Sequence, residues 1–427
     1  MFIKSITLHN FRCFSDLHIE FKNRLTVIVG NNGAGKSTIL EAASIAAGTL
    51  TSAMDGLTNY SIKKDDAHYK YYDLGSTVDV QPQFPVEITA SGEIDNKNIS
   101  WTRNLNSLKG RGSLAAAKDL TSIAAQYQAR MRNGDSTLNL PIISYYGTGR
   151  LWAQHKEKKN DTFDKNNRSN GYIDSLDGAS NDKMMKKWFK KMTIQQYQKE
   201  ETIPEFEAVQ IALQQAFSLI TGYSNVKLQY NLDTDEIDIL YFDHDKKHIR
   251  IPLSQLSDGY KCTISLIADI AYRMAILNPQ LLNNVLTETN GIVLIDEIDL
   301  HLHPIWQKRI LNDLMSIFPK VQFIVSTHAP EIINSVKSDS IIILKGNEAI
   351  TTSNETYGKD VNTILNEVMD VSARPDEIDN YINEFYQLLD QSKYNDAELI
   401  LQKIEEKIGT NDPEINSFRT RLALEQM

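Results

Sequence analysis

The chain has 427 residues, of which 41% are hydrophobic and 23% charged, and its formal net charge is −10 at pH 7. The composition is that of a globular protein, and the length allows two or three domains. The negative net charge argues against a generally basic nucleic-acid coat. Its two cysteines, Cys13 and Cys262, lie far apart, which excludes a disulfide framework, and they show no metal-ligand spacing. No apolar run has the length of a signal peptide or a membrane span, so we expect a cytoplasmic protein without a membrane partner.

The N-terminal region is predicted to form strands followed by a phosphate-binding loop. Strand-like apolar patterns cover residues 5–11, 16–21 and 24–30. The third strand runs into GNNGAGKST (30–38), after which helical spacing begins. In this setting glycines let backbone N–H groups surround a phosphate, and the helix N-terminus adds positive charge. We therefore expect Lys36 to reach the β- and γ-phosphates of a nucleoside triphosphate and the Ser37 hydroxyl to bind Mg²⁺.

Two segments in the first half of the chain carry less specific patterns. Residues 51–140 mix polar loops with strand-like stretches and one helical stretch, which predicts an antiparallel sheet flanking the nucleotide. Residues 153–250 form a partly helical, locally basic insertion. One helix there has an apolar face bordered by lysines, made of Met185, Trp188, Phe189 and Met192. This helix either packs on its own domain or offers a surface to DNA or a protein partner.

The stretch GIVLIDEIDLHLHP (291–304) places two adjacent acids at the end of an apolar strand. Next to a phosphate loop in a parallel sheet, Asp296 is placed to hold Mg²⁺, and Glu297 to orient or deprotonate the attacking water. Adjacent buried carboxylates are costly unless a cation and a water use both. A second apolar strand, residues 321–325, leads to His328, which either senses the γ-phosphate or is structural.

The stretch LSDGYK (256–261) precedes a long helical pattern, with Ser257 and Gly259 at the helix start. This arrangement is either an ordinary N-cap or an anion-binding site. Further on, residues 371–427 form an acidic tail with 6 basic and 12 acidic side chains. Helical patterns there predict a hairpin and a third helix, at 376–391, 396–409 and 414–427. The tail is either a docking surface for a basic partner or a support for oligomers.

Taken together, these motifs resemble the ABC-type ATPase heads of the SMC and RecF-like class. The matching order is phosphate loop (30–37), signature (256–261), acidic strand (292–297), Asp299 loop and His328. LHNFRCF (8–14) resembles the start of that class, and YYGTGRLW (145–152), DEIDLHLHP and STHAPEII resemble forms in overcoming-lysogenization-defect (OLD) ATPases. The resemblance is closest to the ATPase of Septu antiphage systems, also found with retrons. The signature departs from the usual Leu-Ser-Gly-Gly-Gln at Asp258 and Tyr260, and no glutamine can be assigned to the Q-loop, where Arg150 or a neighbour falls.

The resemblance implies an α/β ABC/SMC-like head, in which a parallel P-loop sheet is joined to a flanking antiparallel sheet, a helical insertion and a C-terminal helical appendage. The head would comprise residues 1–152 and 251–370, with the insertion at 153–250 and the tail at 371–427. ATP and Mg²⁺ are the implied cofactors, with Ser37 and Asp296 on the metal and Lys36, Glu297 and His328 as catalytic groups. The implied nucleotide contacts are Asn10, Arg12, Asn31, Asn32, Gly33, Ala34, Gly35, Lys36, Ser37, Thr38, Ser257, Gly259 and Asp299.

The resemblance also implies an ATP-hydrolysing subunit of a bacterial antiphage complex that controls a separate HNH-type nuclease and does not itself cut nucleic acid. In this class the signature of one chain completes the site of another, so we expect a homodimer or larger homo-oligomer. In a retron, the partners would include the reverse transcriptase with its RNA and DNA. The alternatives are a RecF-like DNA-repair ATPase, a transporter subunit, and an OLD-type ATPase with its own Toprim nuclease, for which Asp376, Glu377 and Asp379 are the candidate acids.

Overall fold

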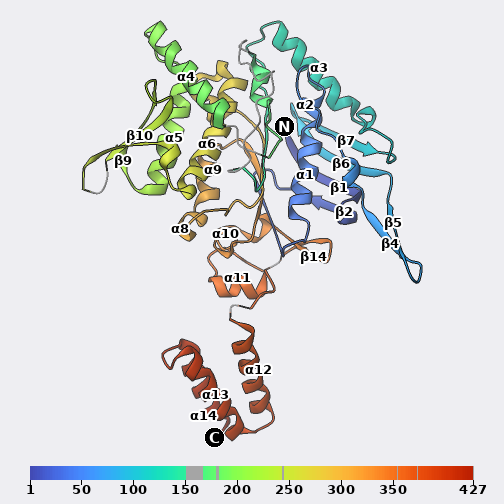
Figure 1. Ribbon diagram of the computed structural model, residues 1–427, viewed down its shortest axis with the longest axis vertical. Coiled ribbons are helices and arrows are strands. Elements are labelled where there is room, and N and C mark those ends of the chain that lie inside the picture. Colours follow the sequence, from blue (N-terminus) through green and yellow to red (C-terminus); the bar gives the residue numbers. More distant parts are fainter. Residues whose placement is uncertain (151–166, 179–181, 243–244, 353, 373, 427) are drawn as a thin grey trace. The chain divides into compact units, whose positions relative to one another are not determined.

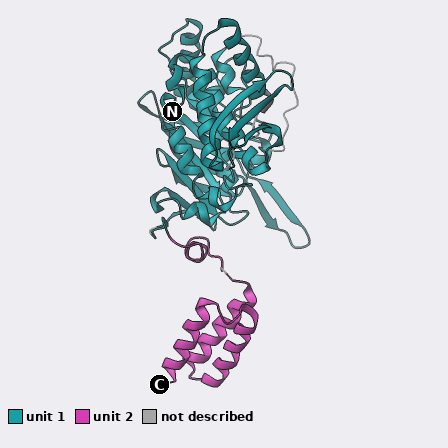
Figure 2. Cartoon of the chain, turned by 90° about the vertical axis from the view of Figure 1, so that its left-hand side faces the viewer, with its two compact units in different colours: residues 1–358 teal, residues 359–427 magenta. Residues whose placement is uncertain are grey.

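The computed structural model describes residues 1–150, 167–178, 182–242, 245–352, 354–372 and 374–426. The chain divides into two compact units, Met1–Gly358 and Lys359–Met427, called here the N-terminal and C-terminal units (Figure 2). The start of the predicted insertion, residues 153–166, lies outside the described residues. Within the described ranges, no helix has both the length and the apolar character needed to cross a membrane.

A six-stranded sheet forms the core of the N-terminal unit (Figure 1). Its order is β15-β14-β3-β13-β12-β8, and every neighbouring pair is parallel except β14 with β15. The strands are β3 (Leu25–Gly30), β8 (Ile142–Tyr146), β12 (Gly291–Ile295), β13 (Val321–Thr327), β14 (Ile341–Lys345) and β15 (Glu348–Thr351). Every residue of β3, β8, β12 and β13 is buried, as expected for parallel strands covered on both faces.

A second, antiparallel sheet of order β2-β1-β6-β7 flanks this core. Its strands are β1 (Phe2–Phe11), β2 (Phe14–Glu20), β6 (Val86–Ile94) and β7 (Lys97–Leu105). Helix α1 (Lys36–Ala47) contacts strands of both sheets (Figure 1). Its apolar side chains are buried. A hairpin of β4 (Tyr69–Asp73) and β5 (Val78–Pro82) forms a separate two-stranded sheet. The parallel core and the flanking antiparallel sheet confirm the predicted fold class.

The second lobe of this unit contains α4 (Asp182–Lys199), α5 (Pro204–Thr221) and a three-stranded antiparallel sheet. The sheet was not predicted from the sequence and consists of β9 (Ser224–Asn231), β10 (Glu236–Phe242) and β11 (His248–Pro252). The predicted apolar face of α4 is buried, with the Trp188 ring edge-on to Phe206 of α5 at 5.5 Å between centroids. Lys186 and Lys190 form ion pairs with Glu236 and Asp235, at 2.8 and 2.6 Å. This helix therefore packs on its own unit.

The remaining helices of the N-terminal unit connect or cover these sheets. They are α2 (Thr49–Ser52), α3 (Lys118–Arg132), α6 (Asp258–Leu277), α7 (Val285–Glu288), α8 (Pro304–Gln307), α9 (Ile310–Ile317) and α10 (Pro330–Ile333). Short 3₁₀ helices are η1 (Lys64–Asp66), η2 (Ala115–Ala117), η3 (Arg168–Tyr172), η4 (Leu253–Gln255), η5 (Pro279–Asn284) and η6 (Ser338–Ser340). Helix α6 is the most deeply buried of them and contacts α4, α5 and β8.

The C-terminal unit is helical, as the resemblance implied. It contains α11 (Val361–Glu367), α12 (Asp376–Asp390), α13 (Tyr394–Ile408) and α14 (Pro413–Glu425), so the predicted hairpin and third helix are both present. One apolar core joins the last three helices, formed by Phe385, Leu389, Ala397, Ile400, Leu401, Ile404, Ile415, Phe418 and Leu422. Asp412 accepts a hydrogen bond from the Glu414 N–H and caps α14.

Phe385→Ala should unfold the C-terminal unit and leave nucleotide binding by the N-terminal unit intact. Phe385 is fully buried and lies 5.4 Å from the Phe418 ring, so truncation should cost about 3–5 kcal/mol, comparable to the whole stability of so small a core. Thermal unfolding followed by circular dichroism, with ATP binding measured in parallel, tests this. Leu399→Ala, at an exposed position of α13, is the control and should change stability by less than about 0.5 kcal/mol. Loss of ATP binding in Phe385→Ala would contradict independent folding.

Candidate functional site

The loop between β3 and α1 has the geometry of an anion site. Gly35, at the N-cap of α1, has φ of 96°, and a Cβ there would lie 2.4 Å from the Phe14 ring, so only glycine fits. No side chain caps α1 and no acid lies in its first turn. Its first backbone N–H groups are therefore available to a phosphate, where the helix dipole favours negative charge.

Lys36 is buried at the start of α1, and its Nζ donates to the carbonyl oxygens of Gly30 and Asn31 at 2.8 and 3.2 Å. Burial lowers the pKa of Lys36, while Asp296, Glu297 and Asp299 act in the opposite direction. Those three acids therefore lie close enough to interact with the ammonium group. A bound triphosphate would add further negative charge close to this desolvated cation.

The two acids after β12 are held by Ser326 at the end of the neighbouring strand. The Ser326 hydroxyl donates to Asp296 Oδ1 at 2.5 Å and accepts the backbone N–H of Glu297 at 2.8 Å. Sequence reasoning named Ser326 only as part of a strand end and gave it no role. Its hydroxyl fixes the carboxylate of one acid and the backbone of the next.

Ser37 and Asp296 line one cavity of about 590 Å³, so the structure brings the two predicted Mg²⁺ ligands together. One hydroxyl and one carboxylate suit Mg²⁺, which commonly takes only one or two protein oxygens and completes its shell with phosphates and water. Within the described residues, no group of three or more His, Cys, Asp or Glu side chains forms a metal site. The residues present thus fit Mg²⁺ bound together with a nucleotide.

Glu297 has φ of 46°, in the left-handed region that side chains other than glycine rarely adopt. The guanidinium of Arg150, in the loop after β8, donates to the carbonyl oxygens of Asp296 and Glu297 at 2.7 and 2.8 Å. Sequence reasoning noted Arg150 only as a neighbour of the missing Q-loop glutamine. The backbone at Glu297 is therefore held from two sides, by Ser326 and by Arg150.

His328 and Asp299 complete this edge of the sheet. Thr327 donates its hydroxyl hydrogen to Asp299 Oδ1 at 2.6 Å. Burial lowers the pKa of the half-buried His328, and Lys36 lowers it further, whereas Asp299, Glu297 and Asp296 raise it. The net lowering favours a neutral imidazole near pH 7, which can donate one N–H to a phosphate oxygen.

The two residues predicted near the nucleotide from LHNFRCF are placed differently. Arg12 lines the cavity with Ser37 and forms ion pairs with Asp66 at 2.8 Å and Glu41 at 2.5 Å. The side chain of Asn10 donates to the Pro85 carbonyl at 3.1 Å and is not among the described cavity residues. Arg12 is thus part of the wall of this cavity. The described hydrogen bond of the Asn10 side chain instead joins two segments of the fold.

The signature residues begin α6 and lie outside that cavity as the structure describes it. Ser257 is exposed at the N-cap and makes no side-chain capping bond, so its hydroxyl is not used by its own helix. At Gly259 a Cβ would lie 2.7 Å from the His301 carbonyl oxygen, so this glycine is also required by packing. Asp258 in the first turn adds a negative charge where the dipole favours an anion.

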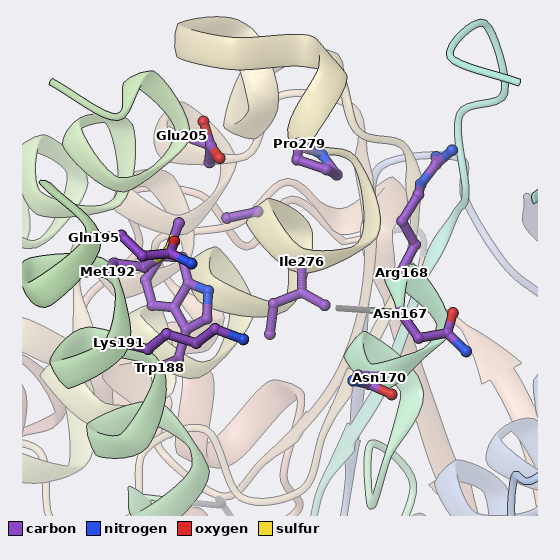
Figure 3. Close-up of a pocket in the computed structure, with 11 residues that line it drawn as sticks. Asn167, Arg168, Asn170, Trp188, Lys191, Met192, Gln195, Glu205, Ile276 and Pro279 are labelled. Atoms are coloured by element: carbon purple, nitrogen blue, oxygen red, sulfur yellow. The ribbon is translucent and has the colours of Figure 1, made fainter. Parts of the chain in front are cut away.

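Other parts of the chain offer weaker candidates. A cavity of about 200 Å³ lies among α4, α5, α6 and η3, with Trp188 and Gln195 facing Ile276 (Figure 3), and its described lining includes no predicted phosphate contact. The candidate Toprim acids Asp376, Glu377 and Asp379 all lie in the first turn of α12, and Glu377 pairs with Lys407. In the described chain they do not form the strand-end arrangement that this nuclease requires.

Comparison with known proteins agrees with this geometry. The family described as "AAA domain" matches residues 5–221, and "AAA ATPase domain" matches residues 117–333. The chain is 28% identical to "Retron Vc95 probable ATPase" of Vibrio cholerae serotype O1 biovar El Tor, over 87% of this chain and 80% of that protein. It is 26% identical to "Retron Ec83 probable ATPase" of Escherichia coli, over 96% and 84%.

Two further matches extend the comparison. "Septu protein PtuA" of Bacillus mycoides (strain KBAB4) is 27% identical over 81% of this chain but only 41% of its own length. An SMC head bound to the C-winged helix domain of ScpA superposes with a TM-score of 0.51 at 19% identity, over 83% of this chain and 98% of that one, which shows a common fold. The chain belongs to the AAA ATPase domain family and has the fold of an SMC head.

Proposed function

We propose that the chain binds and hydrolyses ATP with Mg²⁺ and, through nucleotide-dependent oligomerisation, controls a nuclease in a bacterial antiphage system. The convergence of a desolvated cation, Lys36, with the strand-end groups Asp296, Glu297, Asp299 and His328 carries this proposal. Each of these groups has a role in phosphoryl transfer to water.

The residues divide the chemistry among them. Lys36 and the N–H groups of α1 bind the phosphates, while Ser37 and Asp296 hold Mg²⁺, which when bound neutralises charge on the β- and γ-phosphates. The Glu297 carboxylate orients the attacking water and accepts its proton. The neutral imidazole of His328 donates a hydrogen bond to the γ-phosphate, and Arg12 adds positive charge from the cavity wall.

A second chain is needed to complete this site. Ser257 and Gly259 do not line the described cavity of their own chain. The N-terminus of α6 can contribute to phosphate binding only where it lies directly against a phosphate. A head-to-tail dimer places the signature of each chain against the γ-phosphate bound by the other, and its symmetry yields two equal sites. ATP would then close the dimer, and hydrolysis would open it.

The link to defence rests on the relatives, whose names assign them to retrons and to Septu. We infer that this chain works in the same setting, beside an HNH-type nuclease and, in a retron, a reverse transcriptase with its RNA and DNA. The C-terminal unit, with its own core and an excess of acidic side chains, is the proposed docking surface for a basic partner.

Lys36→Ala and Glu297→Gln should separate binding from hydrolysis. Loss of the Lys36 charge should weaken ATP binding roughly 10- to 100-fold, since a charge-assisted contact contributes about 1.5–3 kcal/mol. Glu297→Gln should keep ATP bound and lower kcat by roughly 10²–10⁴, the usual contribution of a positioned base. Equilibrium ATP binding and steady-state phosphate release measure the two effects. Wild-type turnover by Glu297→Gln would rule out this role for Glu297.

Mixing two inactive variants should test the composite site. Ser257→Arg damages the site of the neighbouring chain, and Lys36→Ala damages its own, so a mixed dimer retains one intact site. An equimolar mixture in which chains exchange randomly should recover about a quarter of wild-type activity if the two sites act independently. Phosphate release from the mixture measures this, with native mass spectrometry to confirm mixed dimers. No recovery in confirmed mixed dimers would exclude sites shared between chains.

Removal of the C-terminal unit should abolish partner binding without abolishing ATP binding. A shortened chain that ends at Gly358 lacks the whole C-terminal unit. This shortened chain should no longer co-purify with the proposed HNH-type nuclease partner. In the full-length chain, Asp396→Lys with Glu398→Lys reverses two exposed charges on α13 and should weaken the complex, whereas Lys403→Glu on the same helix should not. Undiminished nuclease binding by the shortened chain would place the docking surface elsewhere.

A further inference from the structure

A buried arginine to which the sequence motifs assign no role, Arg150, holds the backbone of Glu297. The Arg150 side chain is buried, with a residue exposure of 3%, and its guanidinium donates to three backbone carbonyl oxygens. They belong to Gly147 at 3.3 Å, Asp296 at 2.7 Å and Glu297 at 2.8 Å. Burying a permanent charge is unfavourable unless it is hydrogen-bonded, and here two of the acceptors are consecutive carbonyls of the strand-end acids.

These bonds matter because of the unusual conformation of Glu297. A left-handed residue other than glycine persists only when its surroundings determine it, and such residues gather at functional sites. At Glu297 the N–H is held by the Ser326 hydroxyl, and the carbonyl groups before and after its Cα are held by Arg150. All three backbone polar groups around this Cα thus have fixed partners, which sets the direction in which the carboxylate leaves the chain.

Arg150 acts without contacting the substrate. It is absent from the described lining of the cavity that Ser37 and Asp296 share, whereas the three residues before it, Gly147, Thr148 and Gly149, line that cavity. One short loop therefore joins the wall of the cavity to the backbone of Glu297.

We propose that Arg150 is a positioning residue for hydrolysis, which holds Glu297 in the orientation that activates water. This inference rests on the proposed ATP hydrolysis at the site. It predicts that loss of Arg150 lowers turnover and leaves ATP affinity almost unchanged, because its three described hydrogen bonds go to backbone carbonyls and not to the phosphate-binding side chain of Lys36.

The first test compares kcat with ATP affinity in full-length variants. Arg150→Ala should lower kcat by about 10²-fold, the usual effect of displacing a catalytic group by about 1 Å, with little change in ATP affinity. Arg150→Lys keeps the charge but loses the planar fork, so it should recover only part of kcat. Arg168→Ala is the matched control, because the Arg168 guanidinium also donates to backbone carbonyls, those of Leu277 and Leu138, away from this cavity. Its removal should lower the melting temperature of the protein. It should not lower kcat measured below that temperature.

The second test asks whether Arg150 acts through Glu297. In a Glu297→Gln background, Arg150→Ala should cause no further loss of turnover, because the group that it positions is already disabled. An equal fold-loss in both backgrounds, or wild-type kcat in folded Arg150→Ala, would overturn the proposal. If Arg150→Ala does not fold, Arg150→Lys and Arg150→Gln carry the same comparison. Failure of the wild-type protein to bind or hydrolyse ATP would instead refute the proposed function, which keeps the two failures distinct.

Discussion

Parallel alignment of β8, β12, β13 and β3 is the constraint on which the candidate site depends. Ile295 of β12 lies opposite Tyr146 of β8 and Val325 of β13, and Thr327 of β13 lies opposite Val29 of β3. The chain therefore leaves all four strands at one edge of the sheet, where the phosphate loop, the acidic pair, His328 and Arg150 all follow. A shift of one residue in any of these pairs would move the groups that follow one strand by about 3.3 Å relative to those that follow its neighbour.

The charges at this edge balance only partly within the protein. Lys36 is buried and bonded to two carbonyls, Asp296 is buried and bonded to a hydroxyl, and Arg150 is buried against the backbone. Such groups lose hydration on folding, and a bound nucleotide with Mg²⁺ supplies the countercharges. Ligand binding should therefore stabilise the N-terminal unit, as mass action requires for any ligand of the folded state. The C-terminal unit, with a separate apolar core, does not share in this balance.

The sequence predicted those features that depend on local patterns. A strand, a glycine-rich turn and a helix lie next to one another in the chain, and apolar strands ending in acids or histidine are visible without a fold. The rule that parallel strands end together then brought Lys36, Asp296 and His328 to one site. Ser326 and Arg150 were missed because their bonds to Glu297 span 29 and 147 residues of sequence, and neither residue type indicates such a contact by itself. For the same reason, the ion pair of Lys190 with Asp235 could not be predicted from the sequence. The sequence therefore left open whether α4 packs on its own domain or offers a surface to DNA or a protein partner.

We propose that ATP is held between two chains, with the phosphate loop of one facing the signature of the other. A cryo-electron microscopy structure of full-length Glu297→Gln protein with ATP and Mg²⁺ tests it most directly. We expect a head-to-tail dimer in which each triphosphate lies between Lys36 of one chain and Ser257 of its partner. We also expect Mg²⁺ to lie between Ser37 and Asp296. A nucleotide bound by the phosphate loop with its γ-phosphate open to solvent, in a monomer or in a dimer joined elsewhere, would contradict it.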